Sequence, residues 1–263
     1  MTAAEEALYR SLVEGPLLVG DLPEGKRFEH EGLEFPTEAP PLNFEQKLGH
    51  LYESALAVLL EASRRYDLLE RNLQLQKDAQ TTVGELDFLV RDLRSGHLIH
   101  LELATKFYLA VETAEGLKLP GPDARDNYFR KIRRLREHQL GLAQRYREAL
   151  PERWRGEAIE SRQLIYGCLF DRIDAADEAR PAAVSADCRR GRWVPVDACG
   201  DFFGPRVAEL QVIPKAMWPV PLELLDGMTF TRWTPEHSRE RCVMVRAGDD
   251  VVPYFIAPAG YPE

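Results

Sequence analysis

The apolar residues of the chain first follow a regular pattern after Asn43. From there they recur three and four positions apart, as on one face of an α-helix, at Phe44, Leu48, Leu51, Tyr52, Ala55, Val58, Leu59 and Ala62. Asn43 can accept a hydrogen bond from a backbone N–H of the first turn, so the pattern predicts a helix with Asn43 as its N-cap. The preceding segment 34–41 contains three prolines and predicts a loop.

Three strand-like segments follow the predicted helix. They cover residues 68–76, 85–90 and 98–111 and are separated by turn-forming residues. The second and third segments are joined by the short sequence DLRSG at 92–96. Such a tight connection makes them antiparallel neighbours, so we expect the three strands to form a meander.

A second amphipathic helix is predicted over 126–150, where Pro151 marks its end, and an apolar strand over 162–170. The order is then helix, three strands, helix, strand. Residues 171–263 are rich in Pro, Gly and Trp and contain short β-like runs. We therefore predict an α/β protein with a mixed sheet and a core at 43–170, preceded by an N-terminal extension (1–42). The C-terminal β-rich extension (171–263) is predicted to pack on the core, either as a subdomain or as an extension of the sheet.

The composition narrows the class of protein. With 44% hydrophobic and 29% charged residues, the 263-residue chain is typical of a globular protein. No apolar run approaches the length of a membrane span, and the N-terminus lacks the pattern of a secretory signal, so we expect a cytoplasmic protein without a membrane partner. The four cysteines form no CxxC pair and predict reduced, buried thiols. The sequence specifies no oligomeric state.

The net charge of −9 lacks the basic surplus of a dedicated nucleic-acid binder. An enzyme that acts on nucleic acid needs only a local basic face, however. The charge therefore counts against a protein that acts on nucleic acid, but it does not exclude an enzyme with such a local face.

Acidic residues lie on one face of two neighbouring predicted strands. Strand alternation places Glu85 and Asp87 on one face of the second, and on one face of the third it places His100, Glu102, Ala104 and Lys106. One interpretation is an ordinary solvent face of a half-buried sheet. The other is a site, because the tight turn would bring Asp87 and Glu102 opposite each other, where two carboxylates repel unless a cation or a proton lies between them.

Several motifs resemble a known superfamily. The series of Glu53 in the first helix, GELDF at 84–88 and HLELATKFYL at 100–109 resembles the PD-(D/E)XK nucleases, whose core has the order helix, three strands, helix, strand. More narrowly, GELDF, ELATKFYL, the stretch 121–140 and VIPKAMWP at 212–219 are similar to the bacterial DUF1853 family of unknown function, which is grouped with those nucleases.

The resemblance implies hydrolysis of phosphodiester bonds in DNA or RNA with Mg²⁺, or Mn²⁺, as cofactor. Asp87 and Glu102 would be the metal-binding carboxylates, and the carbonyl group of Leu103 would be a backbone ligand. Glu53 would be the auxiliary acid of the first helix. An all-oxygen set of this kind suits Mg²⁺.

The chain departs from the superfamily pattern at one position. Where the pattern has a lysine two residues after the acid, this chain has Ala104, and Lys106 follows two residues later. On this reading Lys106 would orient water or stabilise charge, since its long side chain can reach back along the same face. The alternative is a catalytically inactive nuclease fold that binds nucleic acid or a protein partner.

The second predicted helix is locally basic. Arg130, Lys131 and Arg134 are candidates for contacts with substrate phosphates, and Gln139 is a candidate to orient water or substrate. A solvated helix face, balanced by acids elsewhere, is the alternative interpretation of the same residues.

Overall fold

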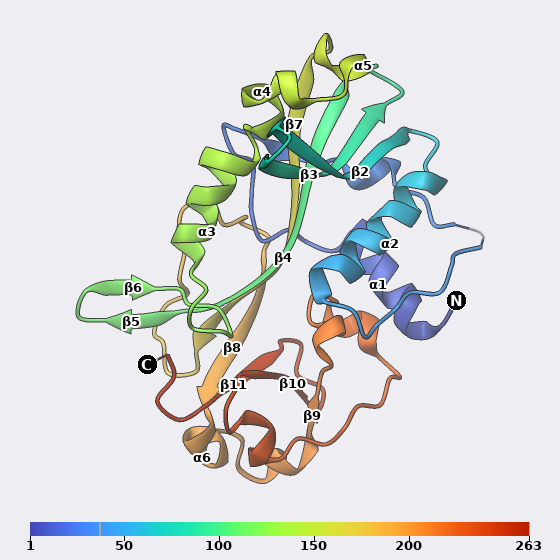
Figure 1. The fold of residues 1–263 in the computed structure, drawn as a ribbon. Coiled ribbons are helices and arrows are strands. Elements are labelled where there is room, and N and C mark those ends of the chain that lie inside the picture. The colour runs from blue at the N-terminus through green and yellow to red at the C-terminus, as the bar shows by residue number, and fades with distance from the viewer. Residues whose placement is uncertain (37, 263) are drawn as a thin grey trace.

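One mixed β-sheet runs through nearly the whole chain (Figure 1). The computed structural model describes residues 1–36 and 38–262, and within these residues nine strands join in this sheet. The strands are β1 (Lys26–Arg27), β2 (Tyr66–Asp78), β3 (Thr81–Asp92), β4 (Leu98–Leu109), β7 (Ile159–Arg172), β8 (Arg189–Pro195), β9 (Leu210–Val212), β10 (Val243–Ala247) and β11 (Tyr254–Ala257). A separate hairpin consists of β5 (Val111–Thr113) and β6 (Gly116–Lys118).

The strand order is β2-β3-β4-β7-β8-β11-β10-β9, with β1 beside the first part of β7. The β2-β3-β4 meander is antiparallel, as the short turns between these strands predict. From β4 through β7 and β8 to β11 the neighbours are parallel, and β11, β10 and β9 are antiparallel again. The prediction of an α/β protein with a mixed sheet is therefore confirmed.

Helices cover both faces of the sheet. The α-helices are α1 (Ala3–Glu14), α2 (Leu48–Ala62), α3 (Tyr128–Arg134), α4 (Leu142–Arg145), α5 (Glu152–Arg155) and α6 (Cys199–Phe203). Short 3₁₀ turns occur at His30–Gly32, Arg147–Ala149, Val196–Ala198, Gly204–Glu209, Lys215–Met217, Leu222–Leu225 and Pro235–Ser238. Figure 1 shows α1 and α2 on one side of β4 and α3 on the other. None of the described helices has the length and apolar character needed to cross a membrane.

Alternation along β4 divides its side chains between two apolar cores. Leu101 and Leu103 pack in the core that contains α1 and α2, whereas Tyr108 packs with Tyr128 and Leu135 on the α3 side. The polar residues His100 and Glu102 lie between these apolar positions. The strand therefore fixes the face on which these two side chains lie.

The central pair of strands, β4 and β7, approaches unusually closely at Gly167. This glycine has φ +148°, and a Cβ atom placed on it would lie 1.6 Å from the carbonyl oxygen of Lys106. Only glycine fits such an approach without displacement of the backbone. Gly167 thereby allows the Lys106 backbone to lie against β7 at this point.

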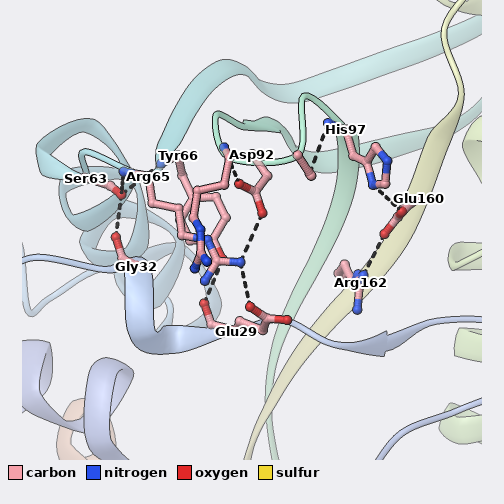
Figure 2. A network of polar contacts seen from close by, with 11 residues as sticks. Glu29, Gly32, Ser63, Arg65, Tyr66, Asp92, His97, Glu160 and Arg162 are labelled. Carbon is pink, nitrogen blue, oxygen red and sulfur yellow. Dashed lines mark hydrogen bonds and ion pairs between the residues drawn. The ribbon is translucent and has the colours of Figure 1, made fainter.

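A polar network at the end of the meander joins it to the N-terminal segment (Figure 2). Arg65 contacts Asp92 at 3.0 Å and Glu29 at 2.6 Å, and the hydroxyl group of Tyr66 donates to the carbonyl oxygen of Glu29 at 3.0 Å. The hydroxyl group of Ser63 donates to the carbonyl oxygen of Gly32 in the same region. We call these residues the Arg65 network, and it ties residues 29–32 to the start of β2 and the end of β3.

The prediction that Asn43 caps the first core helix is wrong. Helix α2 begins at Leu48, after Lys47. The Oδ1 atom of Asn43 instead accepts a hydrogen bond from the backbone N–H of Glu45 at 3.0 Å. Asparagine commonly closes such a local turn, and here the turn competes with a helix start.

The second predicted helix, 126–150, is not continuous. Asn127 caps α3 by accepting from the N–H of Arg130 at 3.2 Å, and a π-helical turn follows at Leu135–Gln139. The N–H of Leu140 donates to the carbonyl oxygen of Leu135 at 2.9 Å, which is the spacing of a π turn. The helix then breaks at Gly141 before α4.

The C-terminal strands belong to the same sheet as the meander. Trp193, Trp218 and Phe255 pack in one core with Phe107 and Leu109 of β4. The four cysteines, all in the described part of the chain, are buried and unbridged, as predicted.

Candidate functional site

The sheet opens between β3 and β4 where the candidate carboxylates lie. These strands pair only from Arg91 and Leu98 to Phe88 and Leu101, whereas β3 pairs with β2 along its whole length. At the opening, an oxygen of Asp87 accepts a hydrogen bond from the backbone N–H of Leu103 at 2.9 Å. A side-chain carboxylate thus takes the place that a backbone carbonyl would have in a continuous ladder. We call this region the sheet opening.

The environment of Asp87 opposes its ionisation. Burial and then the negative charge of Glu102 raise the pKa of the Asp87 carboxyl to about 8, with smaller contributions from Glu53 and Glu85. The hydrogen bond from Leu103 acts in the opposite direction but is outweighed. The sheet opening therefore favours a positive charge, from a proton or a cation, beside Asp87.

Both oxygens of Glu102 are in hydrogen-bonding contact. Oε1 lies 2.8 Å from Nε2 of His100, and Oε2 accepts from the side-chain amide of Gln139 at 2.7 Å. Glu102 is 2% exposed and His100 is 0% exposed. The interpretation of this strand face as an ordinary solvent face is therefore wrong for these two residues.

Gln139 reaches Glu102 from the π-helical turn. It is far from Glu102 in sequence, and the fold of α3 over the sheet brings the two side chains together. The structure thus places Gln139 against a candidate metal ligand.

Glu53 lies at the edge of this acidic group, on α2. Its side chain is 18% exposed and contacts Nδ1 of His50 at 3.3 Å and the amide of Asn72 at 3.5 Å. Asn72 also donates to Glu85 at 3.2 Å and has φ +50°, which is unusual for a residue other than glycine.

Sequence reasoning did not single out His100 or Asn72 for a role at the site. Two features of the sequence point to them. His100 stands two positions before Glu102 on a strand, and Asn72 is a poor strand former within a strand-like run.

Lys106 is half-buried on the same strand as Glu102. Burial lowers its pKa, while the negative charges of Asp126 and, less strongly, Asp87 raise it and Lys131 lowers it further. Lys106 therefore lies within electrostatic range of Asp87. Ala104 is half-buried and packs against the apolar core on the α3 side.

The basic candidates of α3 divide into two groups. Lys131 is half-buried and lies 3.7 Å from Asp126, which places it near Lys106. Arg130 and Arg134 are exposed, and they are four positions apart on one face of the helix. Arg130 also donates to the carbonyl oxygen of Arg125.

A surface groove of about 350 Å³ lies along another part of α3. Phe129, Arg133 and Arg136 line it, but Asp87 and Glu102 do not. Arg136 is paired with Glu24 at 2.8 Å. The groove is therefore distinct from the sheet opening.

The donors at the sheet opening suit a hard divalent cation. As arranged here, no three or more His, Cys, Asp or Glu side chains among residues 1–36 and 38–262 surround a common point for a metal ion. The available set is the carboxylates of Asp87 and Glu102 with the carbonyl of Leu103, which is expected to face the same gap as its N–H. Mg²⁺ fits such a set, because it is commonly held by one or two carboxylates and keeps several waters.

Comparison with known proteins gives a family. No curated protein and no solved structure matches the chain. The family model described as "Domain of unknown function (DUF1853)" matches residues 28–246 of the 263. This range includes the sheet opening and all the motifs that resemble the family in sequence. The chain therefore belongs to the DUF1853 family.

Proposed function

We propose that this protein is a Mg²⁺-dependent nuclease with a PD-(D/E)XK-type core that hydrolyses phosphodiester bonds of DNA or RNA. The observation that carries the proposal is the position of Asp87 beside Glu102 at the sheet opening, where its carboxyl group accepts from the Leu103 N–H and where burial and the charge of Glu102 raise its pKa. Groups with such perturbed ionisation cluster at functional sites, where a bound cation relieves the repulsion.

The order of elements supports the same proposal. Helix α2, the β2-β3-β4 meander, α3 and β7 follow one another along the chain in the order of the superfamily core. Asp87 and Glu102 lie on adjacent strands of the meander, and Glu53 lies on the helix that precedes it.

The chain's own residues would have separate roles. Asp87, Glu102 and the Leu103 carbonyl would hold Mg²⁺, which when bound supplies an activated water and offsets charge on the phosphate. Lys106 would stabilise negative charge near Asp87, and Glu53 would act as the auxiliary acid. Arg130, Lys131 and Arg134 would bind phosphates along the substrate.

Cleavage of labelled single- and double-stranded DNA and RNA with Mg²⁺ or Mn²⁺ tests the proposal. We expect wild type to cleave at least one substrate, and Asp87→Asn and Glu102→Gln to lose about 100-fold or more of that activity. Glu115→Gln, an exposed acid on the β5-β6 hairpin, is the matched control and should stay active. Mn²⁺ should also raise the melting temperature of wild type but not of Asp87→Asn.

Failure of both readouts would contradict the nuclease proposal. The second candidate is an inactive nuclease fold that binds nucleic acid or a protein partner, and Ala104 at the usual lysine position favours it. That function predicts binding without cleavage, unchanged by EDTA and by Asp87→Asn.

A further inference from the structure

His100 is buried at a cost that packing does not explain. Its imidazole ring is 0% exposed, and its Nδ1 atom has no hydrogen-bond partner among the described residues. A buried polar atom without a hydrogen-bond partner destabilises the folded state. An apolar side chain would fill the same space without this penalty. The other ring nitrogen, Nε2, lies 2.8 Å from Oε1 of Glu102.

Which atom donates in this hydrogen bond follows from the position of the single proton on the neutral imidazole ring. A neutral imidazole has one N–H and one lone pair. With the proton on Nε2, His100 donates to the Glu102 carboxylate, and the unpartnered Nδ1 carries only a lone pair. The opposite tautomer would bury an unpartnered N–H and would require a protonated Glu102.

The two partners of Glu102 differ in how firmly they are held. His100 is on the same strand, two positions away, so alternation fixes it beside Glu102 on one face. Gln139 is half-buried and lies at the end of a π-helical turn, from which a flexible side chain reaches Oε2. Of the two contacts, the one to Gln139 can be exchanged for another partner with less rearrangement.

We propose that His100 is a positioning residue for Glu102, and that Gln139 is the exchangeable partner which yields Oε2 to a divalent cation. The proposal rests on the proposed function, because it treats Glu102 as a metal ligand. His100 holds the carboxylate in one orientation before the metal arrives. Outer partners of metal ligands commonly act in this way.

Two substitutions at His100 test whether the N–H group that donates to Glu102 matters, because both remove the imidazole ring but only one keeps that N–H. His100→Gln keeps an amide N–H close to the position of Nε2, whereas His100→Asn places its amide near that of Nδ1, away from Glu102. In titrations of the metal-free protein with Mn²⁺, His100→Asn should bind about 10- to 100-fold more weakly than wild type, and His100→Gln and Gln139→Leu within about threefold. His97→Asn, at an exposed histidine that pairs with Glu160, is the control and should bind as wild type does.

The outcomes distinguish the two proposals. If wild type binds Mn²⁺ and His100→Asn binds as tightly as His100→Gln, the positioning role is wrong while the nuclease proposal stands. If Gln139→Leu weakens binding as much as His100→Asn does, Gln139 is not the exchangeable partner. If wild type binds no Mn²⁺ at all, the proposed function fails and this inference with it.

A measurement on wild type covers the case in which the His100 variants do not fold. ¹⁵N NMR of the metal-free protein reports the tautomer of each histidine, and His100 is identified by the slow exchange expected of an enclosed N–H. We expect the Nε2–H tautomer. An Nδ1–H tautomer would overturn the proposal, because Nε2 could then only accept from Glu102.

Discussion

Asp87 couples the stability of the metal-free protein to pH. Its carboxyl pKa is raised from 3.8 to about 8, so the folded protein holds this proton more tightly than the unfolded chain does. The resulting stabilisation is fully present below the unfolded pKa and is lost as the pH rises through about 8.

Replacement of Asp87 by Asn should remove this dependence. In EDTA, we expect the melting temperature of wild type to fall relative to Asp87→Asn between pH 5 and pH 9. Differential scanning fluorimetry across that range measures the difference. Parallel curves for the two proteins would show that Asp87 ionises normally in the folded state.

Substitution of Lys106 tests whether the protein is an active nuclease or an inactive nuclease fold. Lys106→Ala should lower metal-dependent cleavage about 100-fold or more, since it removes a positive charge near the reacting phosphate. It should keep the Mn²⁺-induced melting shift, because the lysine is not a metal ligand. The double variant Ala104→Lys with Lys106→Ala should recover part of the activity. If Lys106→Ala alone loses the Mn²⁺-induced melting shift, Lys106 has a structural role instead.

At the level of single residues, the sequence predicted which charged side chains lie close together, but it did not predict which polar side chains are buried. The tight turn at 92–96 and strand alternation predicted Asp87 and Glu102 to be neighbours on adjacent strands, and the structure has them as electrostatic neighbours. It did not indicate that His100 and Glu102 are enclosed, because polar residues alternating with apolar ones look like a solvent face. Part of the cover over Glu102 is Gln139 of the π-helical turn, and no local pattern encodes this contact.

Helix α3 gives a prediction about salt dependence. Arg130→Ala with Arg134→Ala should weaken nucleic-acid binding and lower the slope of log affinity against log salt by about 0.9 for each duplex phosphate that these arginines neutralise in wild type. Arg239→Ala with Arg241→Ala removes two exposed charges outside α3 and is the matched control. Equal slopes for the two double variants would show that the α3 face is only solvated.

The Arg65 network gives a prediction about stability. The side chain of Asp92 is 10% exposed, so Arg65→Ala would leave a nearly buried carboxylate without its cation. We expect a loss of roughly 3 kcal/mol in the free energy of unfolding, measured with urea. Arg64→Ala, at a neighbouring side chain that is 90% exposed, should change it by less than about 0.5 kcal/mol. A similar small change in Arg65→Ala would show that solvent already screens Asp92.

Helices and strands with a regular spacing of apolar residues were predicted well. Their first and last residues were predicted less accurately. The meander strands and the strand at β7 lie where alternation and apolar runs placed them, with ends shifted by a few residues. The start of α2 was missed because the turn at Asn43 competes with helix formation. The break after α3 depends on a π turn and Gly141, and the apolar spacing continues across both.

The continuous sheet joins the C-terminal third of the chain to the rest of the molecule. Residues 171–263 were predicted to be an extension packed on a core, and their strands share a sheet and an apolar core with β4 and β7. That the parallel order runs from β7 through β8 to β11 could not be predicted, because pairing between distant strands leaves little local trace.

We therefore expect the chain to unfold as one unit. Tryptophan fluorescence, to which Trp193, Trp218 and Trp233 of the C-terminal third contribute, and far-UV circular dichroism should give the same urea midpoint. Leu109→Ala, at a buried residue where β4 meets that core, should lower both midpoints together. Two separate transitions would show that 43–170 and 171–263 are independent domains.

The parallel pairing of β4 with β7 also has a kinetic consequence. Leu98 pairs with Ile159, so the central ladder closes only after the intervening segment has formed a loop of some sixty residues. Loop closure of this kind slows folding relative to a hairpin such as β2-β3, whose pairing is local. Gln139 and the basic residues of α3 lie inside that loop. The meander with Asp87 and Glu102 can therefore form early, whereas Gln139, the partner of Glu102, reaches its place late in folding, when the chain has returned to the sheet.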